Sequence, residues 1–384
     1  MTAKINYIIR GIEANLAKSM NKGKVIILYG PRQAGKTTLV QNFFSSRSLP
    51  YLYLACEEER IRRQLIPDSL PLKKIIGDFQ NIVIDEAQKL ENPGLVLKVL
   101  IDNFPRLNII ASGSSSFDLA NKLNEPLTGR HFQFFLYPLS YFEIKRNVPT
   151  PDFDFHWREA LIFGGYPEIF RLAGREEKIK RLITLANDYL YKDILSFNLV
   201  KNSRKIHDLL AAIGLQLGQE VSYHELANLL SVDQKTVERY LDLLEKNFVI
   251  FRLFAFSRNL RSEINRKVKI YFFDSGIRNA LINNFNEERL RTDAGALFEN
   301  YAIVEKMKIY NQRGRSPNFY FWRTYDQKEI DFIEEYEGKI QAIEFKLSQK
   351  SKLSSAAKKQ FLTAYPESEI KLVTPENLET FLSS

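Results

Sequence analysis

Short apolar runs separated by segments of helical spacing dominate the first 140 residues. A run of β-branched and other apolar residues shorter than eight predicts a buried strand, whereas residues 38–44 have apolar positions at helical spacing. Strands that alternate with helices predict a parallel α/β sheet. Residues 1–20 also have helical spacing and predict a helix packed on this sheet. The predicted strands cover residues 25–29, 51–55, 81–84, 108–111 and 131–137.

The middle of the chain changes to helical periodicity. Residues 155–215 read as a set of helices, and residues 221–230 and 234–245 form two more helices around the turn 231–233. Two helices joined by a three-residue turn are typical of a helix-turn-helix. The inward-facing positions are Leu226, Ala227, Val232, Val237 and Leu241. A strand over 248–251 and a basic stretch over 258–269 would complete a winged helix.

Composition narrows the class of protein. At 384 residues and 45% apolar content, two or three folded domains are expected and disorder is excluded. One cysteine, Cys56, excludes an internal disulfide, and four scattered histidines form no zinc spacing. The chain shows no secretory signal and no apolar run approaching 18 residues, so a soluble cytoplasmic protein without a membrane partner is expected. A net charge of +9 permits a polyanionic partner.

The segment from Gly30 to Thr37 fits the pattern G-x-x-x-x-G-K-[ST] between a predicted strand and a predicted helix. Glycines let the backbone N–H groups turn toward a phosphate, where the helix N-terminus adds its positive end. Lys36 would reach the β- and γ-phosphates, and the Thr37 hydroxyl would coordinate Mg²⁺. We therefore predict ATP and Mg²⁺ as ligands. The predicted contacts are Gly30, Pro31, Arg32, Gln33, Ala34, Gly35, Lys36, Thr37 and Thr38.

Two acidic residues follow the predicted strand 49 positions after Lys36. Asp85 and Glu86 would lie at the carboxyl edge of the sheet, where α/β sheets bind ligands. Asp85 would hold Mg²⁺ through water, and Glu86 would polarise the attacking water.

Ser114 and Arg130 are two further candidates, and each has a structural alternative. Ser114 follows the strand at 108–111 and would contact the γ-phosphate or the water, unless the serine-rich segment is only a loop or helix cap. Arg130 would sense the γ-phosphate in cis or be offered to a neighbouring subunit of a homo-oligomer, unless it makes an ordinary surface salt bridge.

Basic residues of the helix-turn-helix region are candidates for DNA contact. Lys235 and Arg239 would lie on the exposed side of the second helix, where groove-reading residues sit. The wing adds Arg258, Arg261, Arg266, Lys267 and Lys269. The alternative is a winged helix that serves as an oligomerisation element or spacer.

The last third predicts a hairpin that gathers charged side chains. Strands over 319–322, 329–333 and 341–346 surround a turn at Glu337-Gly338, so Glu344 and Lys346 share a face with Asp331 opposite. Glu299, on the preceding helix, would be a fourth member. This D…E-x-K cluster is similar to the restriction-endonuclease-like fold, which implies that Asp331 and Glu344 hold a divalent metal. An inactive module with a surface charge pair is the alternative.

Together these motifs resemble the AAA+ superfamily, and more closely a group of bacterial and archaeal predicted ATPases. The closer resemblance rests on Gly129-Arg130, Pro138-Leu139-Ser140, Gly164-Gly165-Tyr166-Pro167-Glu168 and Tyr189-Leu190-Tyr191-Lys192-Asp193-Ile194. It implies a five-stranded parallel sheet over residues 1–150, a helical lid over 151–215, a winged helix over 216–285 and a nuclease-like α/β domain over 286–384. The leading hypothesis is an ATP-driven switch or motor acting on DNA. The alternative is a signalling or scaffold ATPase whose C-terminal domains bind protein and cut nothing.

Overall fold

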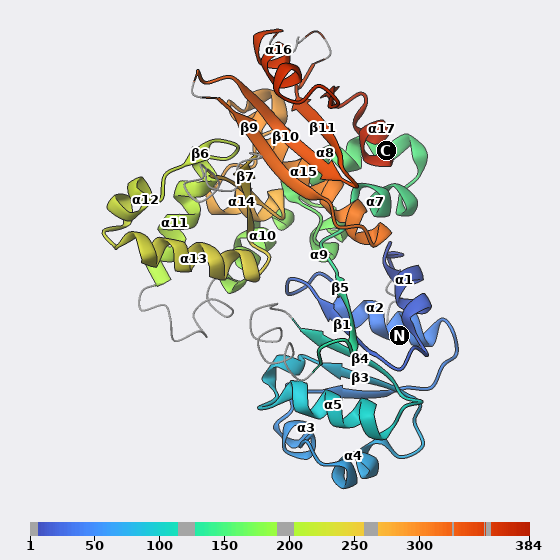
Figure 1. The fold of residues 1–384 in the computed structure, drawn as a ribbon. Coiled ribbons are helices and arrows are strands. Elements are labelled where there is room, and N and C mark those ends of the chain that lie inside the picture. The colour runs from blue at the N-terminus through green and yellow to red at the C-terminus, as the bar shows by residue number, and fades with distance from the viewer. Residues whose placement is uncertain are drawn as a thin grey trace. The chain divides into compact units, whose positions relative to one another are not determined.

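The computed structural model describes residues 7–113, 127–189, 203–256, 268–324, 326–348, 350 and 355–384. The chain divides into two compact units (Figure 1). The first holds Met1–Thr150 with the short segments Tyr166–Glu168 and Lys246–Phe248, and the second holds the rest of the chain.

The first unit is built on a five-stranded parallel sheet with the order β2-β3-β4-β1-β5. This sheet confirms the parallel α/β core expected from the sequence. Because the strands are parallel, their carboxyl ends lie along one edge, with Tyr29 beside Gly113 and Ala55 beside Asp85. The strands are β1 (Val25–Tyr29), β2 (Leu52–Ala55), β3 (Asn81–Asp85), β4 (Asn108–Gly113) and β5 (His131–Phe135).

Part of the helix predicted over residues 1–20 is present as α1 (Glu13–Ser19), and residues 1–6 lie outside the described residues. Before α1, the backbone N–H groups of Arg10 and Gly11 donate to the carboxylates of Glu13 and Glu143 instead of to helical carbonyls. Leu16 of α1 packs into the apolar core beneath β1. The other helices are α2 (Lys36–Ser45), α3 (Glu59–Gln64), α4 (Ser69–Ile76), η1 (Ala87–Lys89), α5 (Pro93–Asn103) and α7 (Tyr141–Asn147). The short helix η2 (Thr150–Asp152) crosses the boundary to the second unit.

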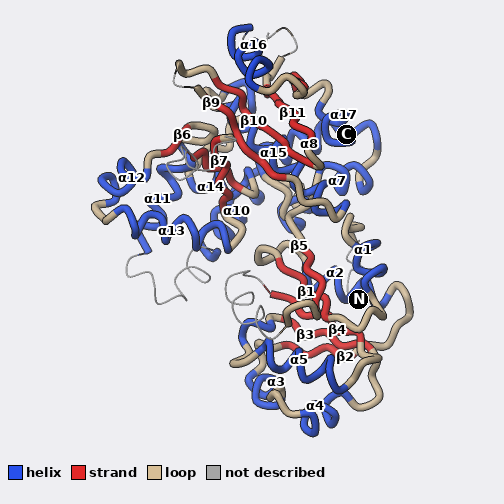
Figure 2. The backbone as a smooth tube through the Cα atoms, in the orientation of Figure 1, coloured by secondary structure: helices blue, strands red, loops and turns tan. Residues whose placement is uncertain are grey.

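The second unit contains a mixed seven-stranded sheet with the order β12-β11-β10-β9-β7-β8-β6. Strand β7 pairs in parallel with β9 at Phe254 and Tyr320, so the sheet continues across the boundary predicted at residue 286. Figure 2 shows these strands with helices around them. The strands are β6 (Glu220–Val221), β7 (Ile250–Ala255), β8 (Val268–Phe272), β9 (Asn318–Arg323), β10 (Glu329–Tyr336), β11 (Lys339–Phe345) and β12 (Glu369–Val373).

The helices predicted over 155–215 belong mainly to this second unit and pack there on α14. Gly164 and Gly276 permit the close approach: a Cβ on Gly276 would lie 2.2 Å from the carbonyl oxygen of Phe163. Asn279 fixes the contact by donating to the carbonyl of Ile162 at 2.8 Å. These helices are α8 (Phe153–Phe163), α9 (Pro167–Arg171), α10 (Arg175–Tyr189), α11 (Ser203–Leu215) and α14 (Ser275–Leu281).

The two helices predicted on either side of the turn 231–233 are α12 (Tyr223–Leu230) and α13 (Gln234–Lys246). Ser222 caps α12, Ser231 ends it in the left-handed region at φ 50°, and the Asp233 carboxylate accepts the N–H of Thr236 at 2.9 Å. These caps satisfy backbone groups that the helix ends leave open. The remaining helices are η4 (Glu288–Leu290), α15 (Ala294–Arg313), α16 (Ser355–Ala364) and α17 (Leu378–Ser383).

Candidate nucleotide-binding site and carboxylate cluster

The segment between β1 and α2 has the backbone of a phosphate-binding loop. A Cβ on Gly30 would lie 2.2 Å from the carbonyl oxygen of Leu136, so only glycine fits there. Gln33 and Gly35 adopt positive φ angles of 59° and 95°. Left-handed residues in such a loop turn successive N–H groups toward one side, which makes a concave anion site at the start of α2.

Lys36 provides the positive charge of this loop. Its side chain is buried, and Nζ donates to the carbonyl oxygens of Gly30 at 2.7 Å and Pro31 at 3.0 Å. Lys36 is the first residue of α2, and its ammonium bonds to the first residues of the loop. Its side chain therefore crosses the loop from one end to the other. A phosphate that accepts hydrogen bonds from the loop would therefore lie close to the positive charge of Lys36.

Asp85 lies at the end of β3 with three hydroxyl donors around its carboxylate. Thr37 Oγ1 donates to Oδ2 at 2.9 Å, the Tyr53 hydroxyl also donates to Oδ2, and Ser112 donates to Oδ1. The Thr37–Asp85 contact joins the two predicted magnesium ligands. A hydroxyl and a carboxylate are the oxygen donors that Mg²⁺ prefers, so this donor set fits the ion.

Tyr53 and Ser112 are site residues that the sequence reasoning missed. Burial and the bond to Asp85 raise the pKa of Tyr53 well above its usual range, so the phenol stays a donor. Ser112 belongs to the same strand end that suggested Ser114, and its position two residues earlier puts it beside Asp85. Ser114 lies outside the described residues.

Glu86 follows Asp85 in a left-handed conformation, with φ 54° and ψ 44°. Non-glycine residues rarely adopt this region, and such geometry is concentrated at functional sites. Gln88 Nε2 donates to the Glu86 carboxylate. Glu86 therefore stands at the carboxyl edge of the sheet, where its N–H donates to Ser112 of the neighbouring strand β4, and β4 in turn pairs with β1, the strand that precedes the loop.

Arg130 lies at the opposite edge of the sheet from the loop. It directly precedes His131, which pairs with Val25 at the start of β1, while the phosphate loop follows the end of β1. Five strand residues separate the two edges by about 16 Å. Arg130 forms an exposed salt bridge with Asp102 at 3.4 Å. A role toward the γ-phosphate of its own chain is therefore wrong, and a role in a neighbouring subunit stays a prediction.

The predicted hairpin of the second unit brings Asp331, Glu344 and Lys346 together. Lys346 Nζ lies 3.0 Å from Glu344 Oε2 and 3.9 Å from Asp331 Oδ2, and the Phe345 N–H donates to Asp331 at 2.9 Å. Burial and the neighbouring Asp331 carboxylate raise the pKa of Glu344 to about 7. The turn between the strands uses positive φ angles at Glu337 and Gly338.

Lys269 was predicted to meet DNA phosphates, and the structure corrects this. Its side chain is 1% exposed and forms ion pairs with Glu299 and Glu329. Burial lowers the pKa of Lys269, but these carboxylates outweigh it and hold the pKa above its usual value. All five residues of β8 are buried, so Lys269 lies inside the unit and not on an exposed wing. The other wing residues, Arg258, Arg261, Arg266 and Lys267, lie outside the described residues.

Glu299, predicted as a fourth member of the Asp331, Glu344 and Lys346 cluster, contacts Lys269 and Tyr271. Burial raises its pKa to about 8, and it accepts a hydrogen bond from the Tyr271 hydroxyl. Across the described ranges, no group of three or more Asp, Glu, His or Cys side chains has an arrangement that could hold a metal ion. Asp331 and Glu344 alone remain as a candidate pair, and two carboxylates completed by water are an ordinary Mg²⁺ donor set.

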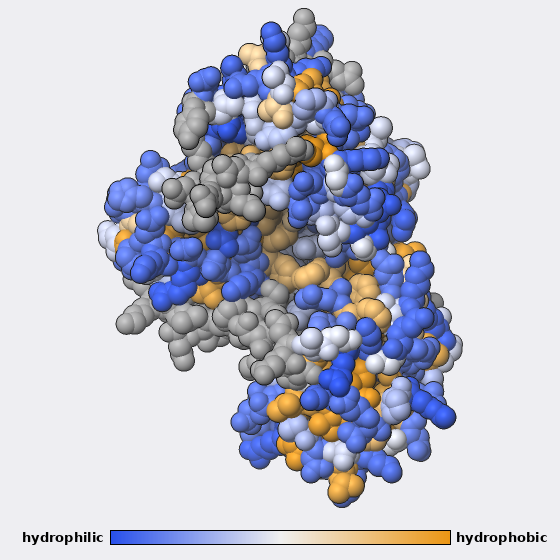
Figure 3. Space-filling view, in the orientation of Figure 1, coloured by the Kyte–Doolittle hydropathy of each residue, from blue (hydrophilic) through white to orange (hydrophobic). Residues whose placement is uncertain are grey.

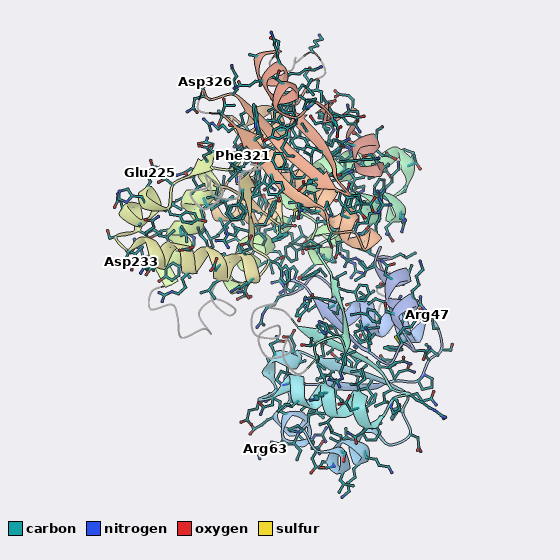
Figure 4. The ribbon with its side chains drawn as sticks, viewed as in Figure 1. Arg47, Arg63, Glu225, Asp233, Phe321 and Asp326 are labelled. Atoms are coloured by element: carbon teal, nitrogen blue, oxygen red, sulfur yellow. The ribbon has the colours of Figure 1, made fainter. Side chains whose placement is uncertain are left out.

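Helix α13 has three acidic residues: Asp242 and Glu245 are paired within the unit, whereas Glu238 is exposed beside the basic residues Lys235 and Arg239. Arg252 contacts Asp242 and Glu245, each at 2.6 Å. Lys235 and Arg239 are exposed and lie one helical turn apart on one face. Figure 4 labels Glu225 of α12 and Asp233 in the turn before α13, and Figure 3 shows a largely hydrophilic surface over α12 and α13.

Comparisons with known families divide the chain into three parts. Residues 22–145 match the family described as an AAA domain. Residues 154–288 match a domain of unknown function, DUF8612, and residues 294–381 match another, DUF4143. The match over residues 22–145 and the loop geometry support a P-loop fold for the first unit that is similar to AAA ATPase domains.

Relatives span bacteria and archaea. The chain is 29% identical over 353 residues to an uncharacterized protein of Mycobacterium tuberculosis, covering 90% of this chain and 76% of that protein. It is 25% identical to an uncharacterized protein of Methanocaldococcus jannaschii, covering 86% and 75%. Among solved structures it is similar to the Walker-type ATPase of Pyrococcus abyssi, with 18% identity, a TM-score of 0.49 and coverage of 73% and 97%. No helix in the described part of the chain is long and apolar enough to cross a membrane.

Proposed function

We propose that the protein binds and hydrolyses ATP with Mg²⁺ at the edge formed by the phosphate loop, β3 and β4. The observation that carries this proposal is the 2.9 Å hydrogen bond from Thr37 to Asp85, because it joins the loop to the acidic strand end. Thr37 and Asp85 would hold the ion, which supplies charge neutralisation at the phosphates. Lys36 binds the β- and γ-phosphates, and Glu86 orients the attacking water. Purified protein should release phosphate from ATP with Mg²⁺ and stop when EDTA is added.

We propose further that ATP turnover serves an action on DNA through α13. The support is the arrangement of charge: Asp242 and Glu245 are paired with Arg252, which leaves Lys235 and Arg239 exposed one turn apart. The rival proposal is a signalling or scaffold ATPase whose second unit binds protein. The burial of Lys269 favours this rival, because its side chain forms ion pairs inside the second unit and is not free to contact a DNA phosphate.

Reversing the charge of α13 separates these two proposals. Lys235→Glu with Arg239→Glu should weaken binding of every duplex at least tenfold and flatten the dependence on salt, because each lost phosphate contact reduces counterion release. A labelled duplex titrated at several salt concentrations measures both effects. The matched control is Lys358→Glu with Lys359→Glu on α16, which makes the same change of net charge at exposed positions. Equal affinity of both variants, or no salt-dependent binding by the wild type, would favour the protein-binding proposal.

The nuclease-like cluster has its own test. If Asp331 and Glu344 take a divalent cation, Mn²⁺ should raise the melting temperature of the second unit by a few degrees, through preferential binding to the folded state. Asp331→Asn should remove the shift. The measurement uses the Lys36→Ala background without nucleotide, so that the ATP site does not contribute. If Lys346 already neutralises the pair, Mn²⁺ will leave the transition unchanged, and metal-dependent cleavage is ruled out of the function.

A further inference from the structure

A buried arginine from the segment before β1 reaches the phosphate loop. Arg10 is 5% exposed, and its Nη1 donates to the carbonyl oxygen of Ala34 at 2.7 Å. Ala34 lies between Gln33 and Gly35, the two loop residues with left-handed backbone conformations. Arg10 and Ala34 are 24 positions apart in the sequence, so no local sequence pattern predicts this contact.

The guanidinium of Arg10 is anchored away from the loop by two further groups. Nη2 donates to the carbonyl oxygen of Tyr137 at 2.5 Å, and Nε lies 3.2 Å from Oε1 of Glu143 as an ion pair. Glu143 is 2% exposed, and it accepts the N–H of Gly11 at 2.6 Å and of Ser140 at 2.9 Å. A buried charge is retained only when it is paired and hydrogen-bonded, and here both members are.

The bond to Ala34 determines which way a loop N–H points. The Ala34 carbonyl and the Gly35 N–H belong to one trans peptide group, so they point in opposite directions. With the carbonyl held by Arg10, the N–H of Gly35 is directed to the other side of the loop. Glycine itself imposes little preference at φ 95°, because it lacks a Cβ. Arg10 supplies the constraint that the local sequence does not.

We propose that Arg10 is a positioning residue that holds the phosphate loop in its anion-binding conformation, with Glu143 as its anchor. The proposal rests on the nucleotide site proposed above and extends that site to the segment before β1. Arg10 acts through the peptide between Ala34 and Gly35, and it does not touch the nucleotide. Its loss should therefore weaken ATP and ADP binding by the same factor and leave the rate of hydrolysis at saturating ATP unchanged.

Arg10→Lys tests this directly. A lysine ammonium keeps the charge, but it cannot serve the Ala34 carbonyl, the Tyr137 carbonyl and Glu143 with the fork geometry of arginine. Titration with fluorescent ATP and ADP should show a loss of about tenfold for both, equivalent to about 1.4 kcal/mol. Tyr7→Phe is the control, because it removes a hydrogen bond to Glu13 in the same segment without touching the loop, and it should bind as the wild type does.

A second variant distinguishes a loss of nucleotide affinity from a loss of the fold. Arg10→Met combined with Glu143→Gln removes both buried charges together, so that neither is left uncompensated. It should keep a cooperative melting transition, lose nucleotide affinity, and show faster amide exchange over residues 30–37. Wild-type ADP affinity in both variants would overturn the proposal, as would a loss of affinity seen only with loss of the melting transition. Failure of the wild type to bind nucleotide would instead overturn the proposed function itself.

Discussion

Lys36→Ala is expected to weaken nucleotide binding strongly. The Lys36 ammonium is held inside the loop by the carbonyls of Gly30 and Pro31, and in the proposed function it binds the β- and γ-phosphates. Removing a charge-assisted contact of this kind costs about 3 kcal/mol, which corresponds to a loss of roughly 100-fold in affinity. Titration with a fluorescent ATP analogue measures the loss.

The control for this variant is Lys73→Ala, which removes an exposed lysine from α4 of the same unit. It should bind ATP as the wild type does and melt at a similar temperature. The Lys36 variant should also keep its melting transition, since its bonds to two loop carbonyls contribute little to the core beneath β1. An ATP affinity of folded Lys36→Ala equal to that of the wild type would contradict the assignment of the loop as the nucleotide site.

The sheet of the first unit and its loop could be predicted because the signals are local. Five short apolar runs reappear as β1 to β5, and strand β3 delivers Asp85 and Glu86 where the parallel sheet requires. A glycine pattern with its lysine and threonine is contiguous in sequence. The hairpin that brings Asp331, Glu344 and Lys346 together could also be predicted from the sequence, because its turn fixes the register of the two strands.

The remaining site residues depend on contacts between distant segments. Tyr53 reaches Asp85 from another strand, and Arg10 reaches Ala34 from the segment before the sheet. The basic neighbours of Lys269 in the sequence predict a wing residue, yet on β8 its side chain lies among buried carboxylates. Arg130 has a suggestive place in the sequence, but the parallel topology puts it at the wrong edge. Such outcomes follow from tertiary packing, which no local pattern specifies.

Glu86→Gln should behave differently from Lys36→Ala, with binding retained and turnover lost. The substitution preserves the size of the side chain and the left-handed backbone at this position, and it removes only the negative charge that orients and polarises water. A group in this role contributes about 10²- to 10⁴-fold to the rate. We therefore expect ATP affinity close to that of the wild type and phosphate release slowed by at least 100-fold.

The measurement pairs a fluorescent ATP titration with phosphate release under single-turnover conditions, which separates binding from the chemical step. Glu91→Gln, an exposed neighbour five positions later, makes the same chemical change away from the strand end and should leave both quantities intact. Gln88 donates to the Glu86 carboxylate, so Gln88→Ala should slow release less than Glu86→Gln, because it frees the carboxylate without removing it. Parallel loss of affinity and turnover in Glu86→Gln would show that this carboxylate supports the fold of the strand end, and the water-orienting role would have to be sought elsewhere among the residues around Asp85.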